Sequence, residues 1–178
     1  GEISLAHNGV LFMDELPEFK RHVLEVLRQP MEGRTMTISR ANFTIEYPAS
    51  FMLVASMNPC PCGYYNHPER ECECPPGAVQ KYLSRISGPL LDRIDIHLEV
   101  TPVPFQDLSQ DAQAESSSVI RERVIRSRKI QQERFKDHPD IHCNAQISPS
   151  LMYRHCRPDA AGSSLLKNAM ERLDFSAR

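Results

Sequence analysis

A short apolar run that ends in two carboxylates constrains the fold more than any other part of the chain. Residues 10–13 read Val-Leu-Phe-Met, follow Gly9 and precede Asp14 and Glu15. This pattern predicts a buried strand of a parallel sheet. One carboxylate at a strand end can hold hydrated Mg²⁺, and a second can orient or deprotonate a water that attacks phosphorus. The run therefore has the form of a Walker B motif, with Asp14 on Mg²⁺ and Glu15 on the water. The alternative is a strand end that enters a polar loop.

A second apolar run, residues 51–56, predicts another buried strand, and it leads into Met57-Asn58-Pro59. Ligands of open α/β sheets bind at the carboxyl ends of the strands. We therefore expect Asp14, Glu15 and Asn58 to face one crevice, where Asn58 positions the attacking water or a γ-phosphate. The alternative role of Asn58 is turn formation, because Asn-Pro commonly begins a turn.

Residues 18–28, between these runs, have the spacing of an amphipathic helix that begins near Pro17 and stops at Pro30 and Gly33. Its expected apolar face consists of Phe19, Val23, Val26 and Leu27.

Residues 36–47 alternate loosely and are rich in Thr, Ile, Phe and Tyr, with an interruption at Ser39-Arg40-Ala41-Asn42. Such a pattern predicts a β-hairpin with Arg40 near its tip.

Composition excludes several classes of protein. The chain has 178 residues and a formal net charge of −2, so it carries no global nucleic-acid signature. It has no apolar run of membrane-spanning length and no signal peptide, and we expect a cytoplasmic protein without a membrane partner. The chain opens on Gly1 and closes on Arg178 just after a plausible helix start at Ser176, so we interpret it as part of a longer protein.

Four of the six cysteines crowd into one segment, which is unlike a disulfide framework. Four thiolates can complete a tetrahedral zinc site, and His67 is a spare ligand. Reduced free cysteines and a [4Fe–4S] cluster are the alternatives. The expected ligands are Cys60, Cys62, Cys72 and Cys74.

The rest of the chain is expected to become helical. A short helical turn at 90–93 precedes an alternating strand at 94–100, and Pro102-Val103-Pro104 marks a domain boundary. Helices are then predicted at about 112–136, 149–155 and 159–173. The first is strongly basic, which favours a solvated face, a subunit interface or a DNA contact.

Several sequence runs resemble those of the AAA+ module of the magnesium-chelatase ATPase subunit family, of the ComM or YifB type. The matching runs are 9–15, 27–32, 57–63 and 87–95, and the order of elements is similar to that of MCM helicases. The resemblance extends over essentially the whole chain. It implies an α/β fold: a partial AAA+ core over 1–102, with a parallel sheet and an inserted β-hairpin, and a small all-α lid domain over 103–178.

The resemblance also implies residue roles. Asp14 and Glu15 match the Walker B pair, and Asn58 matches sensor 1. Three arginines match further roles: Arg93 matches the arginine finger, Arg178 matches the sensor 2 arginine, and Arg40 matches the basic tip of the pore hairpin. Phosphoryl transfer needs cations around the γ-phosphate, and an arginine supplied in trans makes hydrolysis depend on assembly. For Arg93 the alternative is a surface ion pair with Asp92 or Asp95.

One motif of the family is missing, because the sequence contains no G-x-x-x-x-G-K-[ST] phosphate loop. In the family this loop lies upstream, so we expect this chain to hold the hydrolytic half of a site that uses ATP and Mg²⁺. Three functions are compatible with the sequence. One is a DNA-remodelling motor, a helicase or branch-migration enzyme, which we expect to assemble as a ring, a hexamer. The second is a magnesium- or cobalt-chelatase motor subunit acting on a tetrapyrrole partner, and the third is a zinc-binding interaction module.

Overall fold

The computed structural model describes residues 1–41, 43–100, 102–103 and 115–173. The chain divides into two compact units, Gly1–Val103 and Pro104–Arg178. Each is described by itself. None of the described helices is both long and apolar enough to cross a membrane.

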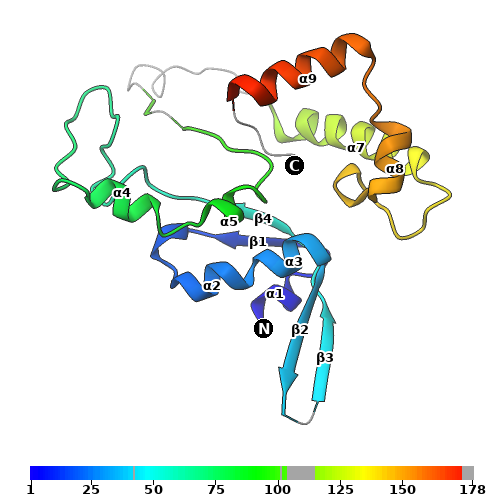
Figure 1. The fold of residues 1–178 in the computed structure, drawn as a ribbon, viewed down its shortest axis with the longest axis horizontal. Helices are drawn as coiled ribbons and strands as arrows, with labels where there is room; N and C mark the ends of the chain where they lie inside the picture. The colour runs from blue at the N-terminus through cyan, green and yellow to red at the C-terminus, as the bar shows by residue number, and fades with distance from the viewer. Residues whose placement is uncertain (42, 101, 104–114, 174–178) are drawn as a thin grey trace. The chain divides into compact units, whose positions relative to one another are not determined.

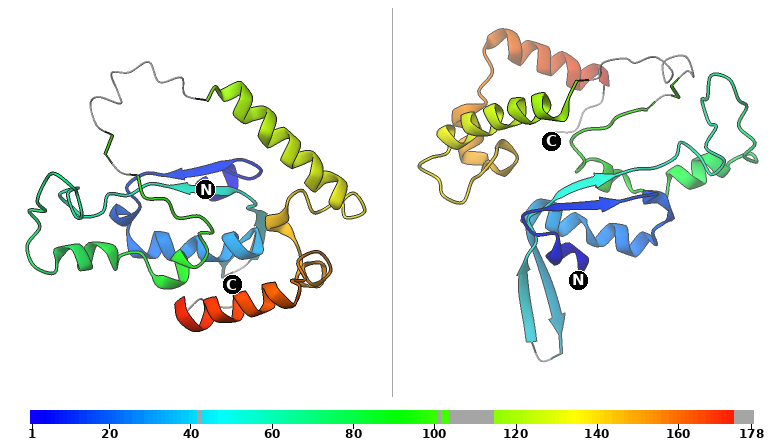
Figure 2. Two further views of the ribbon diagram at one scale, coloured as in Figure 1. Left: turned by 90° about the horizontal axis from the view of Figure 1, so that it is seen from above. Right: turned by 180° about the vertical axis from the view of Figure 1, so that it is seen from behind.

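A two-stranded parallel sheet lies at the centre of the first unit. Helix α1 (Glu2–Leu5) leads into β1 (Val10–Met13), which pairs with β4 (Met52–Ala55) although many residues separate them. The two strands run side by side in every view (Figures 1 and 2). The register aligns Val10 with Met52 and Met13 with Ala55. The predicted parallel sheet is therefore confirmed, and the carboxyl ends of its two strands lie together.

The sheet buries only one of its faces in the described chain. Met13 packs with the helical segments, and the core cluster consists of Met13, Leu16, Leu24, Leu27, Ile86 and Leu90. On the opposite face Val10, Phe12, Met52 and Val54 are 41–60% exposed. The prediction of buried strands therefore holds for one face of the sheet and is wrong for the other within the first unit. The reason is the alternation of side chains along a strand, because helices cover one set of positions only.

The segment predicted as one helix over 18–28 consists of three pieces. These are the 3₁₀ helix η1 (Leu16–Glu18), α2 (Arg21–Val26) and α3 (Arg28–Gly33). Helical structure does not stop at Pro30, because this residue lies in the first turn of α3, where a missing N–H costs no helical hydrogen bond.

The predicted apolar face of this segment is also wrong in part. Leu24 and Leu27 are buried in the core, whereas Phe19, Val23 and Val26 are each more than a third exposed. The buried positions continue to Met31, which packs against the core. Their spacing of three and four residues follows one helical stripe, but the stripe is displaced from the predicted one because the helix begins later.

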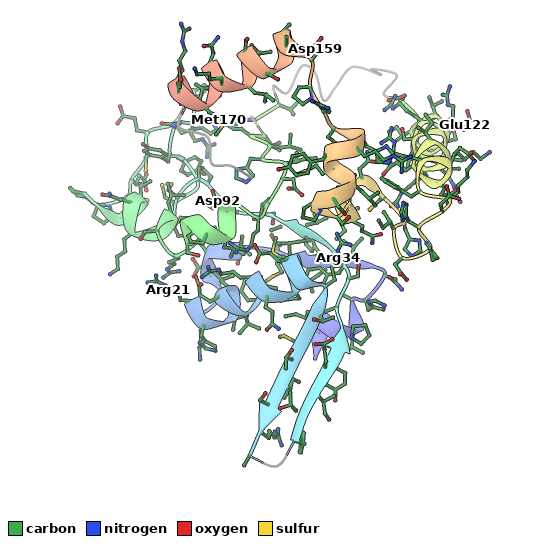
Figure 3. The ribbon with its side chains drawn as sticks, turned by 45° about the vertical axis from the view of Figure 1, so that its right-hand side comes forward. Arg21, Arg34, Asp92, Glu122, Asp159 and Met170 are labelled. Atoms are coloured by element: carbon green, nitrogen blue, oxygen red, sulfur yellow. The ribbon has the colours of Figure 1, made fainter. Side chains whose placement is uncertain are left out.

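The predicted hairpin is confirmed. Strand β2 (Thr35–Arg40) pairs with β3 (Phe43–Pro48) in antiparallel register, and Arg40 stands opposite Phe43 at the last pair of the ladder. The hairpin projects from the sheet and helices of its unit (Figure 1). Arg34 lies where α3 meets β2 (Figure 3), and its φ of 56° places it in the left-handed region that ends the helix.

Two short helices follow the cysteine-rich loop, and a predicted strand does not form. Helix α4 covers Ala78–Leu83 and α5 covers Gly88–Leu91, close to the turn predicted at 90–93. Residues 94–100 join no sheet within the part of the chain that the structure describes. Ile96, Leu98 and Val100 are 73–88% exposed. The alternating pattern is present, but a strand needs a neighbouring edge to pair with.

The second unit is helical, as predicted. It contains α7 (Ser117–Arg134), the 3₁₀ helix η2 (Asn144–Gln146), α8 (Pro149–His155) and α9 (Ala160–Leu173). Phe135 is buried after α7, and its ring meets His155 of α8 edge-on at 5.9 Å. Ser148 caps α8 by accepting a hydrogen bond from the Leu151 N–H. The start of the predicted helix at 112 lies outside the described residues, as does Arg178.

Candidate functional site

The parallel pairing of β1 and β4 brings two polar strand ends together. The Ser56 N–H donates to the Met13 carbonyl at 3.0 Å, and the Leu16 N–H donates to the Ser56 carbonyl at 2.9 Å. These bonds extend the ladder beyond the strands and place Asp14 beside Ser56. The Ser56 hydroxyl donates to Asp14 Oδ1. The sheet thus fixes the carboxylate of Asp14 at its carboxyl edge.

Asp14 retains an oxygen that can serve as a metal ligand. Its Oδ1 accepts from the Ser56 hydroxyl and from the Glu15 N–H, the latter at 2.9 Å. Within the described residues its Oδ2 accepts no hydrogen bond. Carboxylate oxygens are the ligands that Mg²⁺ prefers, usually one or two together with waters and phosphate oxygens. The geometry around Asp14 fits a hydrated Mg²⁺.

The backbone of Glu15 is in an unusual conformation. Its φ and ψ are 52° and 49°, in the left-handed region that non-glycine residues rarely occupy. The Glu18 N–H donates to the Glu15 carbonyl at 2.8 Å, which closes the turn into η1. Such conformations cost free energy and cluster at functional sites. The chain therefore turns sharply at the second carboxylate.

Asn58 follows Ser56 by two residues and lies at the same edge of the sheet. Its backbone lies close to the hydroxyl of Tyr82, a residue of α4 that is only 6% exposed. Burial raises the pKa of Tyr82, and the nearby negative charges of Glu18 and Glu15 raise it further. Asp14, Glu15 and Asn58 thus follow the paired carboxyl ends of β1 and β4, with Tyr82 close to Asn58, and the crevice that they are expected to share stays a prediction.

Arg93 lies just after α5 and is held within its own chain. One guanidinium nitrogen, Nη2, is 2.8 Å from Oε1 of Glu32 on α3, and Nη1 donates to the Pro89 carbonyl. Its side chain is 14% exposed, and the buried Nε finds no hydrogen-bond partner among the described residues. The charged partner is therefore Glu32, not the Asp92 or Asp95 that the sequence offers. Arg93 stays a predicted arginine finger, because nothing here tests that role.

The two other basic candidates are Arg40 and Arg178. Arg40 is exposed at the tip of the β2–β3 hairpin. Arg178 lies outside the described residues, so the structure places no sensor 2 arginine.

Four cysteines form a compact thiol cluster in the loop between β4 and α4. The Sγ–Sγ distances are 3.3 Å for Cys60–Cys62, 3.7 Å for Cys60–Cys72 and 3.6 Å for Cys62–Cys72. All four sulfurs, including that of Cys74, lie within 4.8 Å of one another. A tetrahedral zinc site with Zn–S bonds of about 2.3 Å has sulfurs about 3.8 Å apart. The cluster is therefore close to the size that a zinc ion requires.

Backbone N–H groups surround this thiol cluster. The Tyr65 N–H donates to the Cys60 sulfur at 3.3 Å. Hydrogen bonding from the Tyr64 N–H, assisted by the neighbouring thiols, lowers the pKa of Cys62 to about 6. The Cys62 N–H also lowers the pKa of Cys74. Desolvation and the neighbouring sulfurs outweigh this effect and raise the pKa of Cys74 to about 12. The thiols of the cluster therefore differ in how readily they lose a proton: Cys62 loses it more readily than Cys74.

Sequence reasoning missed four residues that the structure places at or near the site. Ser56 was recognisable as a hydroxyl at the end of a predicted strand. No local pattern indicates the other three, because their partners are distant in the chain; these are Glu32, Tyr82 and Arg85.

Comparison with known proteins assigns both units. The profile of the family described as "Magnesium chelatase, subunit ChlI" matches residues 1–108, and that of "Magnesium chelatase, subunit ChlI C-terminal" matches residues 114–178.

Individual relatives agree with these matches. The competence protein ComM of Haemophilus influenzae is 43% identical over the whole chain, and the protein YifB of Escherichia coli is 41% identical over the whole chain; each alignment covers 34% of the relative. The magnesium-chelatase subunit ChlI of Chlorella vulgaris is 26% identical over 68% of this chain and 34% of that protein. The chain thus spans about a third of the length of the curated relatives it matches. It belongs to the magnesium-chelatase subunit ChlI family of AAA+ proteins.

Proposed function

We propose that this chain carries the hydrolytic half of the nucleotide site of an oligomeric AAA+ ATPase, and that the complete motor remodels DNA. In this proposal Asp14 holds Mg²⁺, Glu15 aligns the attacking water, and Asn58 orients the water or the γ-phosphate. Mg²⁺ supplies charge neutralisation on the phosphates when it is bound. Arg93 acts on the nucleotide of a neighbouring subunit in a ring, which we take to be a hexamer, and Arg178 acts as sensor 2.

One observation carries the proposal: β1 and β4 end side by side. The hydrogen bond from Ser56 to Asp14 joins the two strand ends. Asn58 then follows within two residues, close to the buried Tyr82. A water held between a carboxylate and an amide at the carboxyl edge of a parallel sheet is placed where open α/β proteins bind phosphates. The sequence lacks a phosphate loop, so we expect this chain by itself to have no ATPase activity.

DNA is the proposed substrate because of the hairpin. Arg40 lies at the exposed tip of β2, opposite Phe43. Arginine contacts phosphate groups bidentately and without regard to base sequence. A ring that brings such hairpins into its central pore can track a nucleic-acid backbone, and a relative that matches the whole chain is a competence protein. We place the motor in the cytoplasm.

A chelatase motor subunit is the second candidate, because relatives with that name match part of the chain. It shares the ATPase residues, and its partner is a tetrapyrrole-handling protein. A backbone-tracking arginine at the hairpin tip has no evident use in that reaction.

We further propose that the four clustered thiolates bind zinc. The cluster supplies the ligand number and the sulfur spacing that a closed tetrahedral zinc site needs, and the N–H groups around it stabilise negative sulfur. No residue of the cluster is left to act on a substrate, so the role of this metal is structural. The motor therefore uses ATP and Mg²⁺ at one site and zinc at another.

The test compares wild-type full-length protein with Glu15→Gln for ATP binding and for hydrolysis with and without DNA. We expect DNA to stimulate the wild type. The Glu15→Gln variant should bind ATP normally and lose turnover, because Asp14 still holds the metal while the aligning carboxylate is gone.

The controls separate the candidates. Stimulation by a tetrapyrrole-binding partner in place of DNA would favour the chelatase function. Normal turnover by Glu15→Gln would remove Glu15 from the mechanism.

A further inference from the structure

The end of helix α4 and the turn after it approach both the carboxylate-bearing and the amide-bearing segments of the proposed hydrolysis site: Arg85 bonds to η1, which follows Glu15, and Tyr82 lies close to Asn58. We propose that Tyr82 of α4 and Arg85 in the turn after it are positioning residues, which hold Glu15 and Asn58 at a fixed separation. We call these two residues the α4 clamp. This inference rests on the proposed function, and it assigns a role to residues that no sequence motif indicates.

The Arg85 half of the clamp fixes the turn that carries Glu15. Arg85 Nη1 donates to the Pro17 carbonyl at 3.0 Å and to Oε2 of Glu18 at 2.9 Å. Both acceptors belong to η1, which begins directly after Glu15. Because the Glu18 N–H also donates to the Glu15 carbonyl at 2.8 Å, Arg85 restrains the far side of the turn in which Glu15 adopts its left-handed conformation.

The Tyr82 half fixes the end of β4. Its hydroxyl lies close to the backbone of Asn58, and the residue is only 6% exposed. Glu15 and Glu18 lie close enough to act on Tyr82 electrostatically. Tyr82 is therefore close both to the Glu15 turn and to Asn58, and a displacement of its ring would be felt at both. Ile86, one residue after Arg85, is buried in the core and anchors the turn.

The thiol cluster ties the start of α4 to the same region. Cys60 comes two residues after Asn58, and Cys74 comes four residues before Ala78, where α4 begins. The Ala78 N–H donates to the Pro75 carbonyl at 3.0 Å, so the chain from the cluster into the helix is short and folded. A metal bound by Cys60 and Cys74 would close this loop and keep α4, with its clamp, beside Asn58.

The exposure of Arg85 allows positioning to be separated from stability. The Arg85 and Glu18 side chains are 47% and 54% exposed. Ion pairs this exposed contribute little to folding. A substitution at Arg85 should therefore leave the protein folded, whereas a displacement of about 1 Å at reacting groups can lower a rate by about a hundredfold.

The experiment uses the full-length protein with variants Arg85→Gln, Arg85→Lys and Tyr82→Phe. Lys81→Gln is the matched control, because it removes an exposed cation from the same helix without touching η1 or Asn58. ATP turnover, KM for ATP, nucleotide affinity and thermal unfolding are measured for each. We expect Arg85→Gln to lower kcat by about tenfold or more with KM and nucleotide affinity unchanged. Arg85→Lys should recover part of the loss, and Lys81→Gln should match the wild type.

Several results would overturn the clamp. A kcat for Arg85→Gln within about twofold of the wild type would do so, as would an equal loss in Lys81→Gln. If Arg85→Gln fails to fold, Tyr82→Phe decides, because it removes one hydroxyl and keeps the ring; an unchanged kcat then refutes the proposal. A wild-type protein without ATPase activity would refute the proposed function instead, before any variant is compared. Removal of zinc from the wild type should lower kcat in the same way, and unchanged turnover by the metal-free protein refutes the anchoring role of the metal.

Discussion

Substituting Glu32 tests how firmly the chain holds its predicted arginine finger. Glu32→Gln keeps the shape of the side chain and one neutral acceptor, so it removes mainly the charge that faces Arg93. Hydrogen bonds between ionised groups are about twice as strong as neutral ones and contribute about 1.5–3 kcal/mol. Arg93 is 14% exposed but Glu32 is 42% exposed, so water replaces part of the loss. We therefore expect the free energy of unfolding to fall by about 1 kcal/mol.

Urea denaturation of this chain measures the loss directly. With an m-value of about 2 kcal/mol/M, a decrease of about 1 kcal/mol shifts the midpoint by about 0.5 M at constant m. Glu25→Gln is the matched control, because Glu25 also meets an arginine at 2.8 Å, in an i,i+3 pair whose Arg28 is 38% exposed. Its midpoint should move less. An unchanged midpoint for Glu32→Gln, or an equal shift in the control, would refute the energetic reasoning.

The same variant has an expected effect on catalysis in the full-length protein. In the proposed finger role of Arg93, the pair with Glu32 must break before the guanidinium can reach the nucleotide of another subunit. Glu32→Gln lowers the free energy needed to release Arg93 by about 1 kcal/mol, which makes the released state about fivefold more populated. If release of Arg93 limits the rate, turnover should rise by up to that factor. Lower turnover would mean that Glu32 presents Arg93 to the neighbouring subunit.

Two further predictions concern the metal and the hairpin. Protein purified without chelator should contain about one zinc per chain by elemental analysis, and Cys60→Ser with Cys72→Ser should lose it; metal-free wild-type protein would count against the site. In the full-length protein, Arg40→Ala should leave basal ATPase nearly intact, weaken binding to all DNA sequences alike and reduce the salt dependence by about one phosphate contact. Identical salt slopes for wild type and variant, with unwinding preserved, would place the nucleic-acid contact elsewhere.

Much of the first unit was predictable because its signals are local. The run Val10–Met13, the run that becomes β4 and the hairpin pattern each identify a strand by composition over a few residues. The helical second unit follows from caps and periodicity, as at Ser148 before α8. In each case neighbouring residues determine the element.

The errors arise where tertiary packing decides. Ile94 to Val100 alternates as a strand does, yet an edge to pair with is missing in the described chain. The helix after Glu15 is displaced because η1 takes its first residues, and the buried stripe then follows Leu24 and Leu27. Sequence periodicity indicates that a face is apolar, but it does not say where the helix begins.

The candidate site divides in the same way. Asp14, Glu15 and Asn58 follow predicted strands that do pair, so the rule for strand ends was enough to propose one shared site for them. The contact of Arg85 with Pro17 spans 68 residues, and the bond of Ser56 to Asp14 spans 42. Contacts at such separations depend on the completed fold, and a single sequence carries no local record of them.

The uncovered face of the sheet explains why the catalytic tests need the full-length protein. Parallel sheets are almost always covered on both faces, and two strands alone are marginally stable in water. Here Val10, Phe12, Met52 and Val54 remain exposed on the strands whose ends carry Asp14 and Asn58. Any shift between β1 and β4 moves those ends relative to each other, and among the described residues it is opposed by the backbone pairing, by the bonds of Ser56 to Asp14 and Leu16, and by the proposed α4 clamp. Because the chain spans about a third of its relatives, we expect the rest of the protein to cover this face and to hold the strand ends still enough for hydrolysis.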